Sequence, residues 1–143
     1  MRVMGLDIGE KRIGVAIADT ATGIAVPLRV MDVRDVLDNA RPWRTLVQGN
    51  EPDALVFGLP KTMRGDAGQQ AARVRACAKR IADACGLPFE FEDERLSSAE
   101  AKRLLREQGL SEREMRGKVD SVAASLFLET WIARNGEDKM EER

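Results

Sequence analysis

The sequence predicts an α/β fold around a mixed five-stranded sheet, in which an antiparallel meander of three strands precedes parallel strands with helices between them. Three observations predict this fold. Residues 1–31 contain three short apolar runs separated by turn residues, which is typical of strands joined by tight turns. From residue 32 onward, segments with a helical period of apolar residues alternate with two more strand-like runs. At 143 residues and 43% hydrophobic content, the chain is the size of one domain with one core.

The first strand-like run, residues 1–8, carries an aspartate among apolar residues. Asp7 projects from the face of the strand opposite Leu6 and Ile8, beside Gly5. A plain explanation is a turn or bulge residue that caps the following hairpin. Because Asp7 lies within the strand and not in the turn, we favour a functional role for its carboxylate.

The second and third strands complete the meander. Residues 12–18 follow the first strand so closely that a hairpin through Gly9 is expected, with the two strands antiparallel. Residues 24–31 form the third strand after a cluster of turn residues at 19–23. Pro27 predicts that this strand lies at an edge of the sheet or ends there.

The rest of the chain alternates helices with two strands. The first of these helices is predicted to kink or break at Pro42, and Gly86 fits the C-terminal cap of the second. The elements expected after the meander are, in order, helix 32–48, a buried parallel strand 54–57 with a turn at 58–60, a basic loop 61–68, helix 69–84, strand 89–91, helix 97–108, a short helical turn from 111 and helix 118–134. Residues 1–134 are expected to form a single domain, and the charged residues 135–143 a flexible tail.

The composition excludes several kinds of chemistry. The chain has no histidine, so the commonest general base and transition-metal ligand is absent, and any metal would be held by oxygen. Cys77 and Cys85 have neither metal-ligand nor disulfide spacing, and we interpret them as core residues in a reducing compartment. No apolar run is long enough to cross a membrane and no signal peptide is visible, so a cytoplasmic protein is expected. A formal net charge of -1 neither supports nor excludes a nucleic-acid partner.

Further acids follow the fifth strand and begin the last helix. Asp93 and Glu94 stand at the strand end, where the plainer explanation is a pair of solvated charges. Strand alternation alone does not decide between the two, and we favour Glu94 as the functional acid. Asp120 lies on or beside the apolar stripe of the last helix, where an unpaired carboxylate is costly. Its plainer explanation is a favourable charge against the helix dipole.

The order of elements resembles the ribonuclease H-like fold, a mixed sheet with an antiparallel meander at one end and helices on both faces. Four motifs in the same order make almost the whole chain similar to the YqgF (RuvX) family. They are GLDIGEKRIGVA at residues 5–16 with Asp19, GLP at 58–60, DERLSS at 93–98 and VDSVAA at 119–124. Members of this family are described as pre-rRNA nucleases and as Holliday-junction resolvase homologues.

The resemblance implies a hydrolase, a metal-dependent endonuclease that acts on structured nucleic acid, with 5′-end processing of precursor 16S rRNA in ribosome biogenesis as the favoured activity. In the implied fold, Asp7, Glu94 and Asp120 converge at one end of the sheet. Phosphodiester hydrolysis without histidine is most readily done with two oxygen-ligated divalent ions roughly 3.5–4 Å apart. We therefore expect these three acids to be catalytic and to bind Mg²⁺ or Mn²⁺.

Basic residues near those acids are expected to contact substrate phosphates and to share charge with the acids. Each lies on a loop or at the end of an element, where surface solubility is the plainer explanation: Arg12, Lys61, Arg64, Arg95 and Lys118. The expected partners are precursor rRNA or branched DNA and ribosome assembly intermediates, with no membrane. The sequence leaves the choice between monomer and homodimer open.

Three other functions stay open at this point. A Holliday-junction resolvase is one alternative that the resemblance also allows, and the same fold could serve as a non-catalytic nucleic-acid-binding module. Actin-like and sugar-kinase ATPases also begin with Asp-x-Gly and a hairpin that cradles phosphate. Those proteins use two such domains around the nucleotide, whereas 143 residues supply only one.

Overall fold

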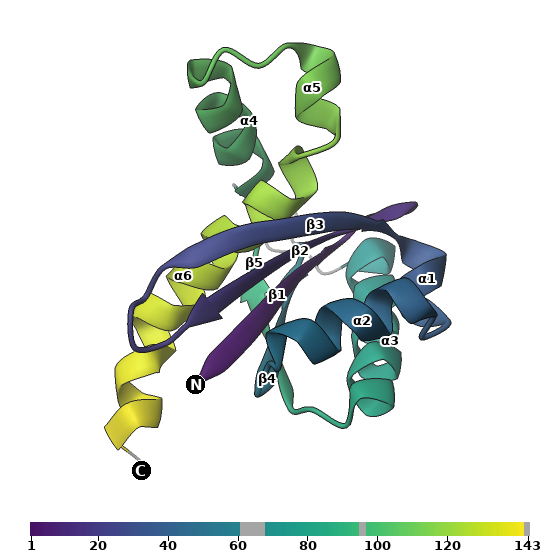
Figure 1. Ribbon diagram of the computed structural model, residues 1–143, viewed down its shortest axis with the longest axis vertical. Coiled ribbons are helices and arrows are strands. Elements are labelled where there is room, and N and C mark those ends of the chain that lie inside the picture. Colours follow the sequence, from purple (N-terminus) through teal and green to yellow (C-terminus); the bar gives the residue numbers. More distant parts are fainter. Residues whose placement is uncertain (61–67, 95–96, 142–143) are drawn as a thin grey trace.

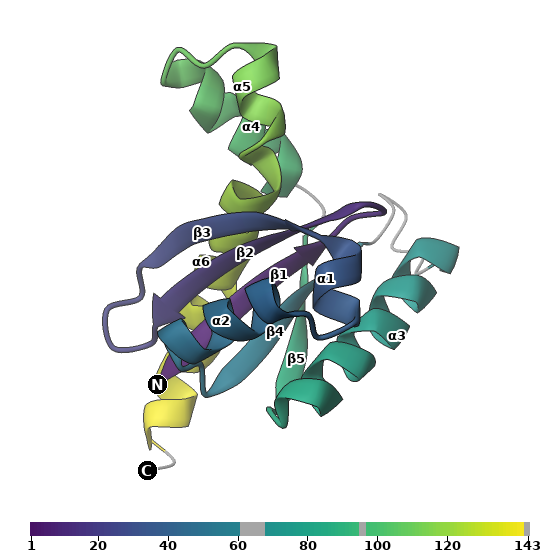
Figure 2. The same cartoon turned by 45° about the vertical axis from the view of Figure 1, so that its right-hand side comes forward.

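The structure is a computed structural model that describes residues 1–60, 68–94 and 97–141. The elements are, in chain order, β1 (Arg2–Ile8), β2 (Arg12–Asp19), β3 (Ala25–Asp32), α1 (Val33–Leu37), α2 (Arg41–Asn50), β4 (Ala54–Leu59), α3 (Gly68–Cys85), β5 (Phe89–Asp93), α4 (Ser97–Glu107), α5 (Glu112–Arg116) and α6 (Val119–Glu141). The five strands form one sheet in the order β3-β2-β1-β4-β5. Helices α1 to α3 lie on one side of the sheet and α6 on the other, while α4 and α5 project beyond it (Figures 1 and 2). The predicted mixed sheet with helices on both faces is confirmed.

The meander begins with the antiparallel hairpin of β1 and β2. The ladder runs from the pair Arg2 and Asp19 to the pair Ile8 and Ile13. The turn closes where the Gly9 amide donates to the Arg12 carbonyl oxygen, at 2.8 Å. β3 pairs with β2 and lies at the edge of the sheet, as Pro27 predicts, and the register shifts by a residue beside it.

Parallel pairing adds β4 to β1 and β5 to β4. β4 continues through Gly58 and Leu59, so the expectation of a turn directly after Phe57 is wrong. The reason is that β5 pairs alongside as far as Leu59, and the ladder holds Gly58 in an extended conformation. The prediction of a buried parallel strand is confirmed.

One face of the sheet packs against α1, α2 and α3. Leu6 of β1 and Leu55 of β4 are fully buried there together with Trp43 of α2. The single helix expected over residues 32–48 is two helices, and the break falls before Pro42 and not at it. Asn39 has a φ of 53°, which ends the helical path, and Pro42 then lies in the first turn of α2, where its missing N–H is not needed.

α3 crosses the same face and contains both cysteines. It extends one residue beyond the predicted range at each end and is followed by Gly86, whose φ of 67° fits the predicted C-terminal cap. Cys77 and Cys85 are half-buried and pack against the core, as expected.

The other face packs against α6. Val3 and Val56 form a second core there with Phe127 and Leu128. Gly14 lets the helix approach, because a Cβ on it would overlap the carbonyl group of Asp120. The lack of a side chain at this position therefore places the first turn of α6 directly on β2.

α4 and α5 form an arm that leads into α6. Ser111 and Glu114 make the predicted capping box of α5, with Ser111 Oγ accepting from the Glu114 amide at 3.2 Å. The expectation that α6 ends at Arg134 is wrong, because the helix continues to Glu141. Residues 137–141 are mostly good helix formers, and Gly136 weakens a helix by only about 1 kcal/mol. Neither α6 nor another described helix has the length and apolar character needed to cross a membrane.

Candidate active site

Asp7 lies near the end of β1, on the face that α6 covers. It pairs with Gly14 of β2 in the ladder and is only 8% exposed. Burial, then a hydrogen bond with the carboxyl group of Glu94 and the charges of Glu94 and Asp120, raise the pKa of Asp7 from 3.8 to about 9. The ionised form of this carboxyl group is therefore strongly disfavoured unless a cation joins it.

Glu94 follows β5 directly and reaches the same place from the other side of β4. Its backbone amide donates to the Leu59 carbonyl oxygen at 3.4 Å. Its side chain fills the space above Gly58, where a Cβ would lie 2.5 Å from Glu94 Oε2 and 2.7 Å from Phe127 Cε2. Within the described part of the chain, Oε2 is buried and has no hydrogen-bond partner.

The register of β4 and β5 decides which of the two neighbouring acids lies beside Asp7. Glu92 pairs with Gly58, and Asp93 pairs with Leu59. Leu59 belongs to the core on the α3 side, so Asp93 projects to that side of the sheet. Glu94 projects to the α6 side, where Asp7 lies.

Asp120 lies in the first turn of α6, above β2. Its side chain is partly exposed, and Arg12 Nε lies 3.8 Å from its Oδ2. Burial raises the pKa of Asp120, while the charges of Arg12 and Lys102 oppose that shift. Asp120 is thus next to the carboxyl pair and shares its charge with cationic side chains.

The acids fit an oxygen-ligated divalent cation, which would supply the positive charge that the Asp7 and Glu94 pair lacks. Asp7 and Glu94 bring two carboxyl groups into contact and leave a buried oxygen unpaired. Among the residues that the structure describes, no three acids or thiols are gathered closely enough to hold a metal ion as they lie. Asp120 has the smallest of the four effects on Asp7. A site of all three acids would need the Asp120 carboxylate to turn from Arg12 toward the pair.

Two of the five basic residues expected to contact the substrate lie near these acids. Arg12 is paired with Asp120, and Lys118 precedes Asp120 by two residues. The other three, Lys61, Arg64 and Arg95, lie outside the described residues.

Sequence reasoning missed one further cation, Lys102 of α4. Its charge lowers the pKa of Asp120 against the larger effect of burial. In the sequence, Lys102 is an ordinary exposed position of an amphipathic helix. Only the packing of α4 against the start of α6 brings it to the site.

The turn between β1 and β2 is held from the opposite face of the sheet. Arg73 of α3 donates from Nη1 to the Gly9 carbonyl oxygen at 2.9 Å and from Nη2 to the Glu10 carbonyl oxygen at 3.3 Å. A hollow of about 320 Å³ lies between this turn and Asp120, and Arg12 lines it. The turn is therefore a fixed wall of the site, with a cation facing the hollow.

A family model described as "RuvX: Holliday junction resolvase" matches residues 1–134. The chain belongs to the RuvX family. A relative from Anaeromyxobacter sp. (strain Fw109-5) is 42% identical over 92% of this chain and 96% of its own length. Another, from Moorella thermoacetica, is 40% identical over 96% of this chain and 99% of its own. Each is named "Putative pre-16S rRNA nuclease", and the RuvX likeness spans the elements that carry all three acids.

Solved structures similar to this RuvX chain include Holliday junction resolvases. Thermus thermophilus RuvC in complex with a Holliday junction substrate matches with a TM-score of 0.56 at 15% identity, over 95% of this chain and 96% of that one. The yeast mitochondrial resolvase Ydc2 matches with a TM-score of 0.51 at 14% identity, over 96% and 80% of the two chains. At these identities the likeness shows the fold alone, and it confirms the expected ribonuclease H-like fold.

Proposed function

We propose that this RuvX-family protein is a divalent-metal-dependent endonuclease that hydrolyses phosphodiester bonds of structured nucleic acid. The observation that carries the proposal is the contact of the Asp7 and Glu94 carboxyl groups in a buried place, with Asp120 beside them. Two carboxyl groups in contact oppose each other's ionisation unless a cation joins them. Such an arrangement is unusual for purely structural acids, whereas clustered carboxylates are the ligands of the oxygen-bound ions that assist phosphodiester hydrolysis.

Asp7, Glu94 and Asp120 would hold Mg²⁺ or Mn²⁺, because both ions prefer carboxylate oxygen. Bound there, the ion would lower the pKa of a water molecule and stabilise charge on the leaving oxygen. Arg12 and Lys118 would orient the phosphates of the substrate against the acids. Phe127 excludes water from one side of Glu94, which strengthens the attraction of its carboxylate for a cation.

We propose precursor 16S rRNA as the substrate, processed at its 5′ end in the cytoplasm with ribosome assembly intermediates as partners. The choice of precursor 16S rRNA is supported by relatives about 40% identical to the chain, which are named "Putative pre-16S rRNA nuclease". Branched DNA is the second candidate. It is supported by the description of the RuvX family model and by the fold shared with a resolvase bound to a Holliday junction.

The test is cleavage of the two substrates by the purified protein. Precursor 16S rRNA and a four-way DNA junction are each incubated with Mn²⁺ or with EDTA. We compare the wild type with Asp7→Asn, with Asp120→Asn and with the control Asp35→Asn, whose acid lies on α1 at the opposite face. We expect Mn²⁺-dependent cleavage of the rRNA that falls about 100-fold or more in the two site variants and stays unchanged in the control.

The other outcomes separate the alternatives. Cleavage that persists in both site variants would contradict the assignment of these acids. If the wild type cleaves only the junction, the resolvase function replaces rRNA processing. If it cleaves neither substrate, a non-catalytic binding module is favoured, and ATP hydrolysis that is lost in Asp7→Asn would favour a nucleotide-binding domain.

A further inference from the structure

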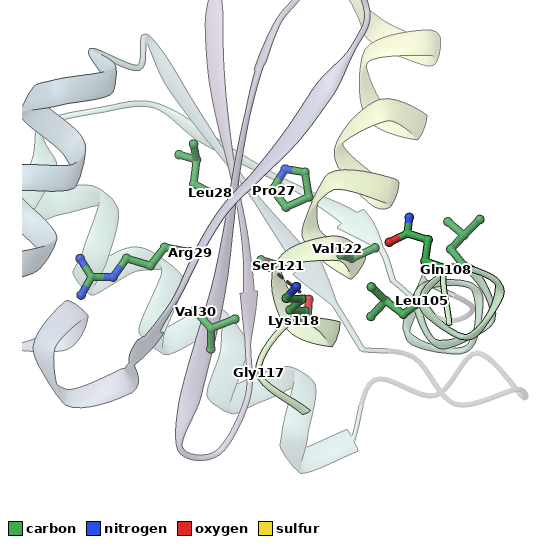
Figure 3. A pocket seen from close by; sticks show the side chains of 11 residues that line it. Pro27, Leu28, Arg29, Val30, Leu105, Gln108, Gly117, Lys118, Ser121 and Val122 are labelled. Atoms are coloured by element: carbon green, nitrogen blue, oxygen red, sulfur yellow. Dashed lines mark hydrogen bonds between the residues drawn. The ribbon is translucent and has the colours of Figure 1, made fainter. Parts of the chain in front are cut away.

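A groove borders the candidate active site on the β3 side of α6. It encloses about 470 Å³ and is formed by β3, α4 and the first turns of α6. Three of the residues that line it, Lys118, Ser121 and Val122, are close neighbours of Asp120 in the sequence. Figure 3 shows these first turns of α6 between β3 on one side and α4 on the other. The groove is thus continuous with the start of the helix that carries Asp120.

The walls of the groove are apolar and partly open to solvent. Pro27 and Val30 of β3 point toward α6, whereas Leu28 and Arg29 point to the other side of the strand (Figure 3). Leu105 of α4 is buried on the opposite wall, and Val122 of α6 is half-buried between them. A flat apolar group of a ligand could therefore be covered on both sides.

Two polar side chains of the groove are available to a ligand. The backbone N–H of Gln108 donates to the Leu104 carbonyl oxygen at 3.2 Å, whereas its side-chain amide makes no hydrogen bond within the described part of the chain. Lys118 brings a positive charge, and none of the described residues that line the groove is acidic. The hydroxyl of Ser121 is already engaged, because it donates to the Lys118 carbonyl oxygen at 3.1 Å. The chemistry of the groove suits an anion with a flat apolar part and an edge that accepts and donates hydrogen bonds.

We infer that this groove receives one unpaired nucleotide of the nucleic-acid substrate. The base lies between the apolar walls with its edge on the Gln108 amide, and Lys118 contacts a neighbouring phosphate. The inference rests on the proposed nuclease function and deepens it, because it assigns a preference for substrates with a single-stranded nucleotide near the cleaved bond. Splayed, unpaired bases are the part of RNA that proteins read in pockets of this kind, whereas a duplex hides its base faces.

Binding without cleavage tests the groove directly. A short single-stranded RNA that contains the fluorescent base 2-aminopurine is titrated with the full chain in EDTA. We compare the wild type with Gln108→Ala, with Val122→Glu and with the control Gln48→Ala, an exposed glutamine of α2 on the opposite face. We expect Kd to rise about three- to tenfold in Gln108→Ala, the effect of one hydrogen bond, and further in Val122→Glu, which adds a negative charge. Equal Kd values for all four proteins would overturn the inference.

Cleavage kinetics separate this inference from the proposed function itself. The cleaved substrate is prepared with a single abasic nucleotide at each position around the cut. At one position, the missing base should raise KM of the wild type about three- to tenfold with kcat kept, and it should have no such effect on Gln108→Ala. Cleavage with the same KM at every abasic position would uphold the nuclease function and overturn the groove. If no substrate is cleaved, the nuclease function fails, and the binding titration in EDTA still decides whether the groove takes a base.

Discussion

Gly58 of β4 leaves the space that the carboxyl group of Glu94 occupies. A Cβ at Gly58 would lie 2.5 Å from Glu94 Oε2 and 2.7 Å from Phe127 Cε2. Phe127 is 1% exposed and belongs to the core between α6 and the sheet, so its ring has little room to retreat. An added methyl group would therefore displace Glu94 from its contact with Asp7.

The first prediction concerns the variant Gly58→Ala. It should lower the free energy of unfolding by about 1–3 kcal/mol, as overpacked cores do, and weaken Mn²⁺ binding about tenfold or more. The matched control is Gly49→Ala in α2, where no atom lies within 4 Å of an added Cβ. In that helix the change should be neutral or stabilise by about 0.5–1 kcal/mol. Denaturation and Mn²⁺ titration measure both effects, and unchanged Mn²⁺ affinity in Gly58→Ala would show that this contact does not hold Glu94 in place.

The second prediction concerns Glu92 and Arg134, which join β5 to α6. Arg134 Nη1 donates to Glu92 Oε1 at 3.0 Å, and Nη2 donates to Oε2. The Glu92 side chain is 3% exposed, whereas that of Arg134 is 59% exposed. Arg134→Ala should lower the free energy of unfolding by about 2 kcal/mol, less than for a fully buried pair, because water can reach the arginine side.

The destabilisation should come from the unpaired buried charge that Arg134→Ala leaves on Glu92. Adding Glu92→Gln to Arg134→Ala should therefore recover part of the lost stability. Urea denaturation of the two single variants and the double variant measures the coupling. Strictly additive losses would mean that the pair contributes nothing as a pair.

The third prediction is a pH dependence of the metal-free protein. The pKa of Asp7 is 3.8 as an ordinary value and about 9 in the fold. Between these values the unfolded chain releases a proton that the folded chain keeps, so the free energy of unfolding falls as the pH rises from about 4 to about 9. Asp7→Asn removes this titration. It should be more stable than the wild type at about pH 8 in EDTA, by about 1–3 kcal/mol.

Urea denaturation at about pH 5 and about pH 8 in EDTA measures this difference. The control Asp35→Asn should lose stability with rising pH as the wild type does, because its acid lies on α1, at the opposite face. Equal slopes for the wild type and Asp7→Asn would contradict the raised pKa of Asp7.

Local sequence patterns predicted the order and type of the elements, apart from the division between α1 and α2, and the two faces of the first strand. The alternation in β1 places Leu6 in the core with α1 to α3 and Asp7 on the α6 side, as predicted. The break between α1 and α2 was predicted at the wrong residue. Pro42 is compatible with the first turn of α2, and it is Asn39 that ends the helical path of α1.

The arrangement of the site depends on contacts between distant parts of the chain. The choice of Glu94 over Asp93 follows from the pairing of β5 with β4, which no pattern within residues 89–94 contains. The space that Gly58 leaves for Glu94 and the approach of Lys102 to Asp120 also depend on contacts between residues that are distant in the sequence. Sequence patterns singled out the three acids, and the resemblance to the RuvX family implied that they converge at one end of the sheet. Their unequal closeness, with Asp120 held by Arg12, is visible only in the structure.

The most direct test of the central claim is a titration of the metal-free protein with Mn²⁺, followed by electron paramagnetic resonance, which needs no knowledge of the substrate. The wild type, Asp7→Asn, Glu94→Gln and the control Asp35→Asn are compared at about pH 8. We predict that the wild type and the control bind Mn²⁺ with equal affinity and that Asp7→Asn and Glu94→Gln each lose about tenfold or more. Mn²⁺ affinity that is the same in all four proteins would contradict a metal site at Asp7 and Glu94.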